Sequence, residues 1–248
     1  MSDLCRQNLL AIDTSTDTCS AALSVSGDIH ERFELAPRNH ARLILPMVES
    51  LLAEAGLTLA QIDALAFGCG PGSFTGVRIA TGVAQGIAFG ADIQVVPVST
   101  LAALAQGVHD ACGATHVLAA LDARMNEVYW GAYVLNDHGL MQLQAEEGVY
   151  PPQQVPLPEA QHWQGAGSGW KHYAEQLHAR LPGCVSAVHA DYYPRAQAIA
   201  RLGSYGLKLG QAVSAELAQP VYLRNEVTWK KLADQSIAAT TGDHTHDQ

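Results

Sequence analysis

The sequence has few basic residues and no long apolar run, and both deficits exclude classes of protein. Lys and Arg number 14 against 24 Asp and Glu in 248 residues, which gives a formal net charge of −10. Non-specific binding to a phosphate backbone depends on basic charge, so contact with nucleic acid must come from a local patch or from another protein. The longest weakly polar stretch, Ile79 to Ala91, is too short to span a bilayer. We therefore expect a soluble protein with no membrane contact.

Cysteine and histidine lack the spacings that disulfide frameworks and metal sites need. The five cysteines are an odd number, widely spread and without a Cys-x-x-Cys pair, which is typical of a reduced, cytoplasmic protein. The eleven histidines contain no His-x-x-x-His, and the close pair His244 and His246 lies in a polar tail. The N-terminus has no basic and apolar leader of the signal-peptide kind. We expect no metal site.

The apolar pattern predicts an α/β organisation. Apolar residues at helical spacing predict a helix from Asn39 to Ala55, which Gly56 ends and Pro46 should kink. A second helix is expected at roughly 75–89, and a third begins at Ser99. Five segments have the character of strands: 9–12, 20–25, 29–35, 64–69 and 93–98. Three meandering strands and then helix–strand–helix–strand predict a mixed sheet with helices on it.

The chain resembles itself at an offset of 109 residues. Leu10 to Asp13 aligns with Ala119 to Asp122, and the strand-like segment 20–25 falls opposite 129–134. One interpretation is a duplicated, two-lobed fold in which each lobe opens with a strand that ends in Asp. The other is that any two strand–turn–strand segments look alike.

A glycine-rich loop follows the expected strand at 64–69. Glycines between a strand and a helix let backbone N–H groups converge on a phosphate, yet the segment matches neither the Walker A loop, nor Gly-x-Gly-x-x-Gly, nor a serine nucleophile elbow. A tight turn with Ser73 or Thr75 capping the helix explains it equally well. Cys69 beside it is either a reactive, low-pKa thiol or, as we favour, a small core residue. The phosphate-loop-like residues are Asp13, Thr14, Ser15, Gly70, Gly72, Ser73, Thr75 and Gly76.

The two strand-end aspartates suggest a nucleotide between the lobes, held by one carboxylate from each lobe through Mg²⁺. Asp13 is followed by hydroxyl-bearing residues, which could wrap a phosphate. Asp122 is followed by Ala-Arg-Met-Asn, which offers neither glycine nor hydroxyl. Half of such a clamp is therefore missing.

Small and apolar residues on the first two expected helices predict an interface. Glycines at every fourth position of the second helix leave a groove, which either packs on the sheet or receives a partner helix. The apolar stripe of the helix 39–55 could join it in that surface. The candidate interface residues are Ile44, Leu45, Val48, Leu52, Gly82, Gly86 and Gly90.

A compact basic and aromatic segment lies near the C-terminus. Arg224, Trp229, Lys230 and Lys231 form a candidate patch for RNA or for a partner protein. The alternative is an ordinary solvated face.

Several segments, taken together and in order, resemble one family. The resemblance covers roughly residues 8–232 and is densest before residue 108. The segments are Leu10–Ser15, Asn39–Ala41 leading to Leu45–Pro46, Gly70–Ile79, Val98–Leu101, Leu121–Arg124 and Pro220–Glu226. They are similar to the TsaB family of tRNA threonylcarbamoyladenosine biosynthesis proteins.

The resemblance implies a two-lobed, actin-like ATPase fold with duplicated ribonuclease-H-like lobes. The expected division is a first lobe of 1–108 to which 217–232 returns, a second lobe of 109–216, and a disordered tail of 233–248. The catalytic relative carries a His-x-x-x-His after its second glycine loop and strand. Here the corresponding place, 99–104, reads Ser-Thr-Leu-Ala-Ala-Leu, without a metal ligand.

The family resemblance also implies a role. It implies a non-catalytic subunit that pairs with a catalytic homologue, which transfers a threonylcarbamoyl group to N6 of the adenosine beside the anticodon of ANN-decoding tRNAs. The resemblance further implies that a small ATPase joins the complex and that this chain contacts tRNA only indirectly. It also implies that the chain alone forms a homodimer through its first two helices. We expect no cofactor of its own, with ATP or ADP and Mg²⁺ only in the assembled complex.

Two rival functions stay open at this point. The first is a genuine ATPase or phosphotransferase that uses Asp13, Asp122 and the loop Gly70–Gly76. The second, weaker rival is a peptidase-like hydrolase, because this family was grouped by similarity with metallopeptidases.

Overall fold

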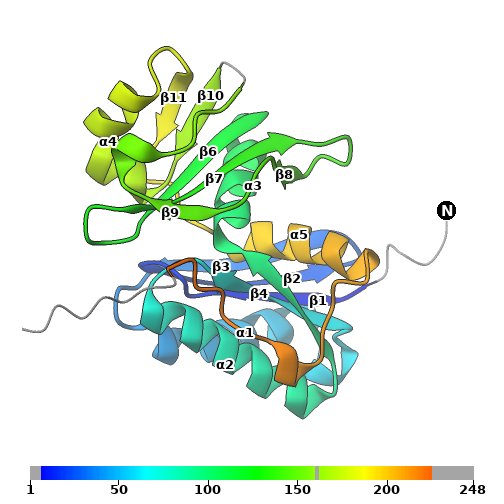
Figure 1. Cartoon of the computed structure of the whole chain (residues 1–248). Helices are drawn as coiled ribbons and strands as arrows, with labels where there is room; N and C mark the ends of the chain where they lie inside the picture. Colours follow the sequence, from blue (N-terminus) through cyan, green and yellow to red (C-terminus); the bar gives the residue numbers. More distant parts are fainter. Residues whose placement is uncertain (1–6, 160–161, 225–248) are drawn as a thin grey trace, which may run out of the picture.

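The computed structural model describes residues 7–159 and 162–224. The chain forms two stacked lobes, each built on one β-sheet (Figure 1). Trp229, Lys230, Lys231 and the expected tail at 233–248 lie outside the described residues.

The first sheet has five strands in the order β3-β2-β1-β4-β5. Its central strand β1 is antiparallel to β2 and parallel to β4, and all five of its side chains are buried. The strands are β1 (Leu9–Asp13), β2 (Thr18–Val25), β3 (Asp28–Leu35), β4 (Ala64–Gly70) and β5 (Gln94–Ser99). Each agrees with the sequence-based prediction to within one or two residues.

The second sheet repeats this plan. Its order is β11-β10-β6-β7-β8, and the short β9 pairs with β7. Its strands are β6 (His116–Asp122), β7 (Val128–Leu135), β8 (Met141–Leu143), β9 (Gly148–Tyr150), β10 (Trp163–Ala166) and β11 (Val185–His189). Like β1, β6 is central, with an antiparallel neighbour on one side and a parallel one on the other. The interpretation of the 109-residue offset as a duplicated, two-lobed actin-like architecture is confirmed.

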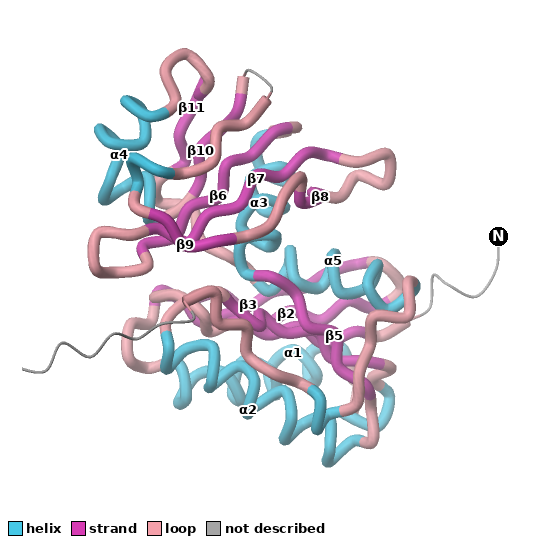
Figure 2. The backbone as a smooth tube through the Cα atoms, viewed as in Figure 1, coloured by secondary structure: helices cyan, strands magenta, loops and turns pink. Residues whose placement is uncertain are grey.

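The helices form layers around the two sheets (Figure 2). α1 (His40–Ala55) and α2 (Phe74–Ala91) cover the outer face of the first sheet, and α5 (Ala196–Lys208) covers its inner face. α3 (Thr100–Cys112) covers the inner face of the second sheet, and α4 (Ser168–Arg180) its outer face. α3 and α5 therefore contact each other between the sheets.

This packing differs from the expected division of the chain. α3 was placed with the first lobe, yet Leu101 and Leu104 belong to the core of the second sheet. α5 was placed with the second lobe, yet Ile199 packs with Leu9 and Ala66 of the first sheet. The chain thus returns to the first lobe at about residue 195 and not at 217, because α5 is needed to cover the inner face of the first sheet.

Serine hydroxyls cap the N-termini of two of the helices that follow strands. Ser73 accepts a hydrogen bond from the backbone N–H of Gly76 at the start of α2, and Ser99 accepts two from the first turn of α3. These bonds satisfy donors that helix starts leave unpaired. α1 continues through Pro46, where a kink was expected. Within the part of the chain that the structure describes, no helix is long and apolar enough to cross a membrane.

The contact between α5 and the first sheet yields a test of the packing. Gly203 of α5 is buried, and a Cβ added there would overlap the Cβ of Ala66. Gly203→Ala should therefore lower the free energy of unfolding in urea by about 1–3 kcal/mol, the usual cost of overpacking. Gly86→Ala is the matched control, because a Cβ at this helical glycine meets open space and should raise stability by up to about 1 kcal/mol. Equal stability of the two variants would contradict the assigned contact.

Candidate functional site

The loop after β1 and the glycine loop after β4 lie directly against each other. The hydroxyl of Thr14 donates to the carbonyl oxygen of Gly76 at 2.7 Å. The backbone N–H of Ser73 donates to the carbonyl oxygen of Ser15, also at 2.7 Å. The structure thus brings the two groups of phosphate-loop-like residues, 13–15 and 70–76, together in the first lobe.

The glycines of this loop make that close approach possible. A Cβ on Gly72 would overlap the carbonyl oxygen of Ser15, and a Cβ on Gly76 would overlap that of Thr14. The N–H of Ser73 is already bonded inside the protein, and its side chain caps α2. These contacts account for the glycines through packing and capping, which was the alternative to contact with a phosphate.

Asp13 is fully buried at the end of β1. Its Oδ2 accepts hydrogen bonds from the hydroxyl and N–H of Ser15, at 3.1 and 3.4 Å, and its Oδ1 has no partner among the described residues. Burial removes the water that would solvate the charge and raises the pKa of Asp13 from an ordinary 3.8 to about 7, although the bonds from Ser15 lower it. Near neutral pH, a large share of this carboxyl is protonated.

Asp122 occupies the equivalent end of β6 and is bound within its own lobe. Its Oδ1 accepts hydrogen bonds from the N–H of Arg124 at 2.9 Å and from the hydroxyl of Tyr173 at 3.2 Å. Its Oδ2 pairs with the guanidinium of Arg124 at 3.2 Å. Both strand-end aspartates therefore have local partners, and among the described residues neither is hydrogen-bonded to the loop of the other lobe.

A hollow of about 300 Å³ lies beside the glycine loop. His40, which lines it, shares a hydrogen bond of 2.8 Å with the carbonyl oxygen of Thr16. The sequence reasoning proposed neither His40 nor Arg38 as a site residue, although both flank the Asn39 that begins α1. The lining residues are Thr16, Asp17, Arg38, His40, Ala41, Ser73, Thr75, Gly76 and Ile79.

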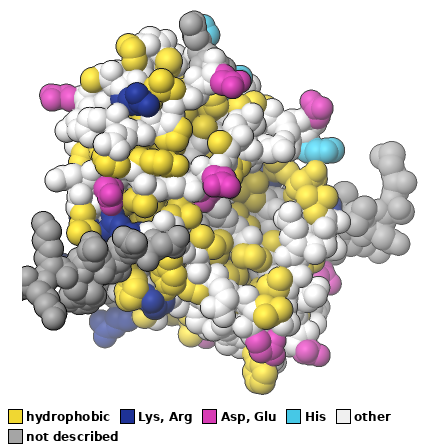
Figure 3. Space-filling view, viewed as in Figure 1, with side chains coloured by type: hydrophobic (Ala, Val, Ile, Leu, Met, Phe, Trp, Pro, Cys, Tyr) yellow, Lys and Arg dark blue, Asp and Glu magenta, His cyan; other side chains and the backbone are white. Residues whose placement is uncertain are grey.

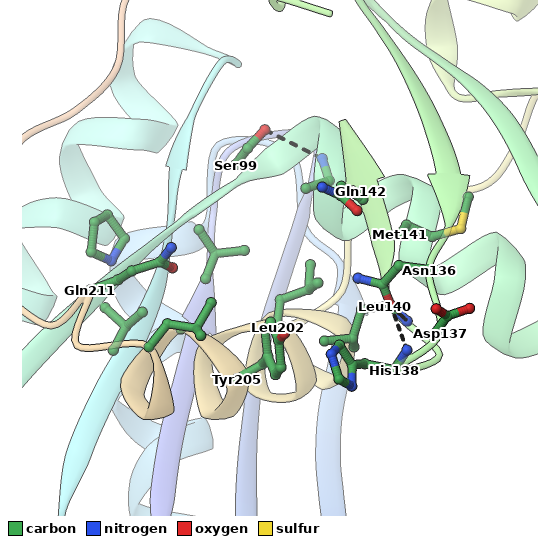
Figure 4. Close-up of a pocket in the computed structure, with 16 residues that line it drawn as sticks. Ser99, Asn136, Asp137, His138, Leu140, Met141, Gln142, Leu202, Tyr205 and Gln211 are labelled. Atoms are coloured by element: carbon green, nitrogen blue, oxygen red, sulfur yellow. Dashed lines mark hydrogen bonds between the residues drawn. The ribbon is translucent and has the colours of Figure 1, made fainter. Parts of the chain in front are cut away.

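A second hollow, of about 590 Å³, lies elsewhere (Figure 4). It is bounded by β5, α5 and the β7–β8 hairpin, where Tyr205 faces His138 with ring centres 5.3 Å apart. No residue singled out from the sequence as a site lines it, and its lining contains Asp137 but neither Lys nor Arg. Its charge therefore does not favour a phosphate.

A buried polar cluster escaped the sequence reasoning. The carboxylate of Glu147 accepts hydrogen bonds from the hydroxyls of Ser99 and Tyr133. Burial raises the pKa of Glu147 and that of Tyr133. Nothing in the local sequence around Glu147 marks it, because its partners lie on β5 and β7.

Cys69 is an unreactive core thiol. Burial raises its pKa to about 12, and the charges of Glu147 and Asp13 act in the same direction. The thiolate, which is the nucleophile, is therefore scarce at neutral pH. The interpretation of Cys69 as a core residue is supported.

Known proteins resemble this chain over most of its length. Residues 24–180 match the family model described as TsaD, tRNA N6-adenosine threonylcarbamoyltransferase. The tRNA threonylcarbamoyladenosine biosynthesis protein TsaB of Escherichia coli is 44% identical over 227 residues, which is 90% of this chain and 97% of the relative. The TsaB of Haemophilus influenzae is 43% identical over 232 residues, 90% of this chain and 96% of the relative. The chain belongs to the TsaB family.

A solved structure agrees with this membership. YeaZ from Pseudomonas aeruginosa superposes on the chain with a TM-score of 0.82 and 49% sequence identity, covering 88% of this chain and 100% of that one. Within the described residues, no group of three or more His, Cys, Asp or Glu could hold a metal ion.

The interface expected from the TsaB resemblance needs correction. Ile44, Val48 and Leu52 are buried in the core beneath the first sheet, because the apolar stripe of α1 is the stripe that covers the sheet. Leu45, by contrast, is 46% exposed. Three of the four glycines of α2, namely Gly82, Gly86 and Gly90, are exposed as well, and Cβ atoms added at these three would meet no described atom within 4 Å. Packing on the sheet is therefore excluded for these glycines.

Arg224, the described member of the candidate RNA or partner patch, is bound inside the TsaB fold. Its guanidinium pairs with Glu127 and donates to the carbonyl oxygen of Ala123 at 3.1 Å. An arginine with these partners is a poor candidate for a phosphate contact. These partners hold Arg224 against the loop after β6, and the patch for RNA or a partner stays a prediction, since its other three members lie outside the described residues.

The buried carboxyl of Asp13 predicts a dependence of stability on pH. Its pKa is higher in the folded chain, about 7, than in an ordinary aspartate, 3.8, so the protonated form favours folding. The resulting stabilisation is fully present below about pH 4 and is lost as the pH rises through about 7. We expect this group to lower the free energy of unfolding across that window with a slope approaching about 1.4 kcal/mol per pH unit.

Asp13→Asn isolates this contribution, because the amide keeps the shape and an acceptor for Ser15 but does not titrate. Urea unfolding of both proteins at several pH values is the measurement. The variant should show a flatter dependence and higher stability at pH 8, while Glu147 titrates equally in both. Parallel curves for the two proteins would show that Asp13 is not the titrating group.

Proposed function

We propose that the chain is a non-catalytic accessory subunit in the formation of threonylcarbamoyladenosine in tRNA. The names of its two TsaB relatives support the pathway. The burial of Asp13 supports the accessory role, because a fully covered, partly protonated carboxyl is ill suited to hold Mg²⁺ on a phosphate. The same observation weighs against the rival function of an ATPase.

The proposed main partner is the catalytic threonylcarbamoyltransferase. The chain itself matches the family model of that enzyme over residues 24–180, which supports a partner of related fold that presents similar helices. On this chain, Leu45 of α1 and the exposed glycines Gly82, Gly86 and Gly90 of α2, which we name the glycine stripe, supply a surface where a helix could approach closely. In the absence of that partner, the same surface would form a homodimer.

The remaining parts of the proposal concern the small ATPase and the tRNA. The net charge of −10 supports indirect contact with tRNA, and Lys and Arg are scattered on the face that Figure 3 shows. The RNA would then be held mainly by the partner. ATP or ADP with Mg²⁺ would likewise belong to the assembled complex, which the small ATPase joins in the cytoplasm.

Reconstitution tests the accessory role. The purified chain should neither hydrolyse ATP above background nor modify tRNA. Added to the transferase and the small ATPase from the same source, it should raise the yield of threonylcarbamoyladenosine, measured by mass spectrometry of digested tRNA. Asp13→Asn should retain this stimulation. ATP hydrolysis by the isolated chain that Asp13→Ala abolishes would instead establish the rival ATPase.

The glycine stripe yields a separate test of the interface. Gly86→Leu should weaken association with the transferase, and self-association, by at least about tenfold, which corresponds to about 1.4 kcal/mol, because a branched side chain blocks close helix approach. Glu175→Leu is the matched control, since it adds leucine to an exposed position of α4 on the other lobe. Sedimentation and pull-down are the measurements, with circular dichroism to confirm folding. Unchanged association of the Gly86 variant would refute the surface.

A further inference from the structure

The C-terminal segment 220–224, which we name the strap, is bound to the end of β4. The backbone N–H of Val221 donates to the carbonyl oxygen of Cys69 at 2.7 Å. A Cβ on Gly70 would lie 2.7 Å from the carbonyl oxygen of Val221, so the absence of a side chain at Gly70 admits the strap. Gly70, which the sequence suggested as part of a phosphate loop, is therefore in contact with the backbone of the strap.

A cluster of side chains fixes the middle of the strap to the start of α2. The ring of Tyr222 lies 6.1 Å from that of Phe74, measured between centres. The guanidinium of Arg78 lies 3.2 Å from the centre of the Phe74 ring and 5.0 Å from that of Tyr222. A cation placed over aromatic faces is attracted by them, so the strap is bound to the first lobe by a side chain as well as by its backbone.

The far end of the strap is bound to the second lobe. Arg224 pairs with Glu127, and its two terminal nitrogens reach the carbonyl oxygen of Ala123 at 3.1 Å and the sulfur of Met125 at 3.2 Å. This loop directly follows Asp122. A planar guanidinium with several fixed acceptors is a specific connector, which a lysine would not reproduce.

The strap therefore joins the end of β4 and the start of α2 in the first lobe to the loop that follows Asp122 in the second lobe. On the first-lobe side this end of β4 leads into the glycine loop, in which Ser73 is hydrogen-bonded to Ser15 of the loop after Asp13. On the second-lobe side, Ala123 directly follows Asp122 in the chain. In proteins built from two lobes, a ligand bound between them commonly closes them by touching both. Here the chain's own residues make the two-sided contact.

We propose that the strap is a built-in substitute for a ligand between the lobes, and that Arg224 is the residue that locks it. Residues 220–224 then hold the two lobes together at this end, in addition to the contact between α3 and α5, and the position of the lobes does not respond to nucleotide. This inference goes beyond the accessory role, since it concerns what holds the chain in one shape whether or not a partner is bound.

Hydrogen exchange of the full-length protein, followed by mass spectrometry, tests the proposal. Arg224→Ala should speed amide exchange about tenfold or more in 123–128, the size expected when the charge-assisted contact with that loop is lost. It should also speed exchange in 68–76, because a strap released at Arg224 no longer holds Val221 against Cys69. Arg32→Ala is the matched control: Arg32 pairs with Glu54 inside the first lobe, so exchange should change only in β3 and α1. Added Mg-ATP should leave exchange of both loops in the unaltered protein unchanged.

Two results would overturn the proposal. One is exchange in 123–128 that Arg224→Ala does not alter. The other is protection of either loop by Mg-ATP in the unaltered protein, which would mean that a nucleotide can still close the lobes. If Arg224→Ala failed to fold, Glu127→Gln would remove the same ion pair from the opposite side, and the same two loops decide the question. A failure of tRNA modification in reconstitution would leave these exchange results unaffected, so the two proposals fail independently.

Discussion

The contact between the loop Thr14–Ser15 and the loop Gly72–Gly76 is the constraint on which the rest of the first lobe depends. It is a contact of backbone on backbone, made through hydrogen bonds of 2.7 Å, and a single methyl group at Gly72 or Gly76 would prevent it. The contact lies next to the end of β1, where Asp13 is fully buried. It also fixes the first turn of α2, and thereby determines that the glycine stripe of that helix faces outward. The features that suggest a nucleotide site in the sequence serve here to close that end of the sheet.

Local patterns predicted the elements well because local physics determines them. The strands, the caps at Ser73 and Ser99 and the 109-residue repeat all follow from short-range periodicity and from side chains that bond to nearby backbone. The assignment of α3 and α5 to lobes was wrong for a different reason. Both helices carry small apolar residues that fit either sheet, and the choice depends on which inner face the rest of the fold leaves uncovered. Likewise, periodicity identified a stripe on α1 but not that Ile44, Val48 and Leu52 face the core.

The candidate site was harder to predict, because its properties arise from distant contacts. The pKa of Asp13 is raised by burial, and the carboxyl lies against Gly68 of β4, which is distant in the sequence. Glu147 gains its partners from β5 and β7, and Arg224 pairs across 97 residues with Glu127. A basic residue near a tryptophan and two lysines reasonably suggests an RNA patch in sequence. Only the fold reveals that its guanidinium is already bound. A loop that binds phosphate and a loop that packs against another loop share one sequence signature. Both need glycines, because in both the backbone must come close to another group.

The contact between α3 and α5 has a consequence for how the chain folds. These two helices form adjoining layers between the sheets, and the hydroxyl of Tyr192, just before α5, donates to the carbonyl oxygen of Gly107 in α3 at 2.8 Å. Each sheet is therefore covered on its inner side by a helix whose far face rests on the other half of the molecule. The first sheet also receives α5 only after the whole second sheet has been synthesised. Although the topology is duplicated, each half therefore completes the packing of the other, and the first sheet is covered on both faces only once the chain has passed through the second lobe.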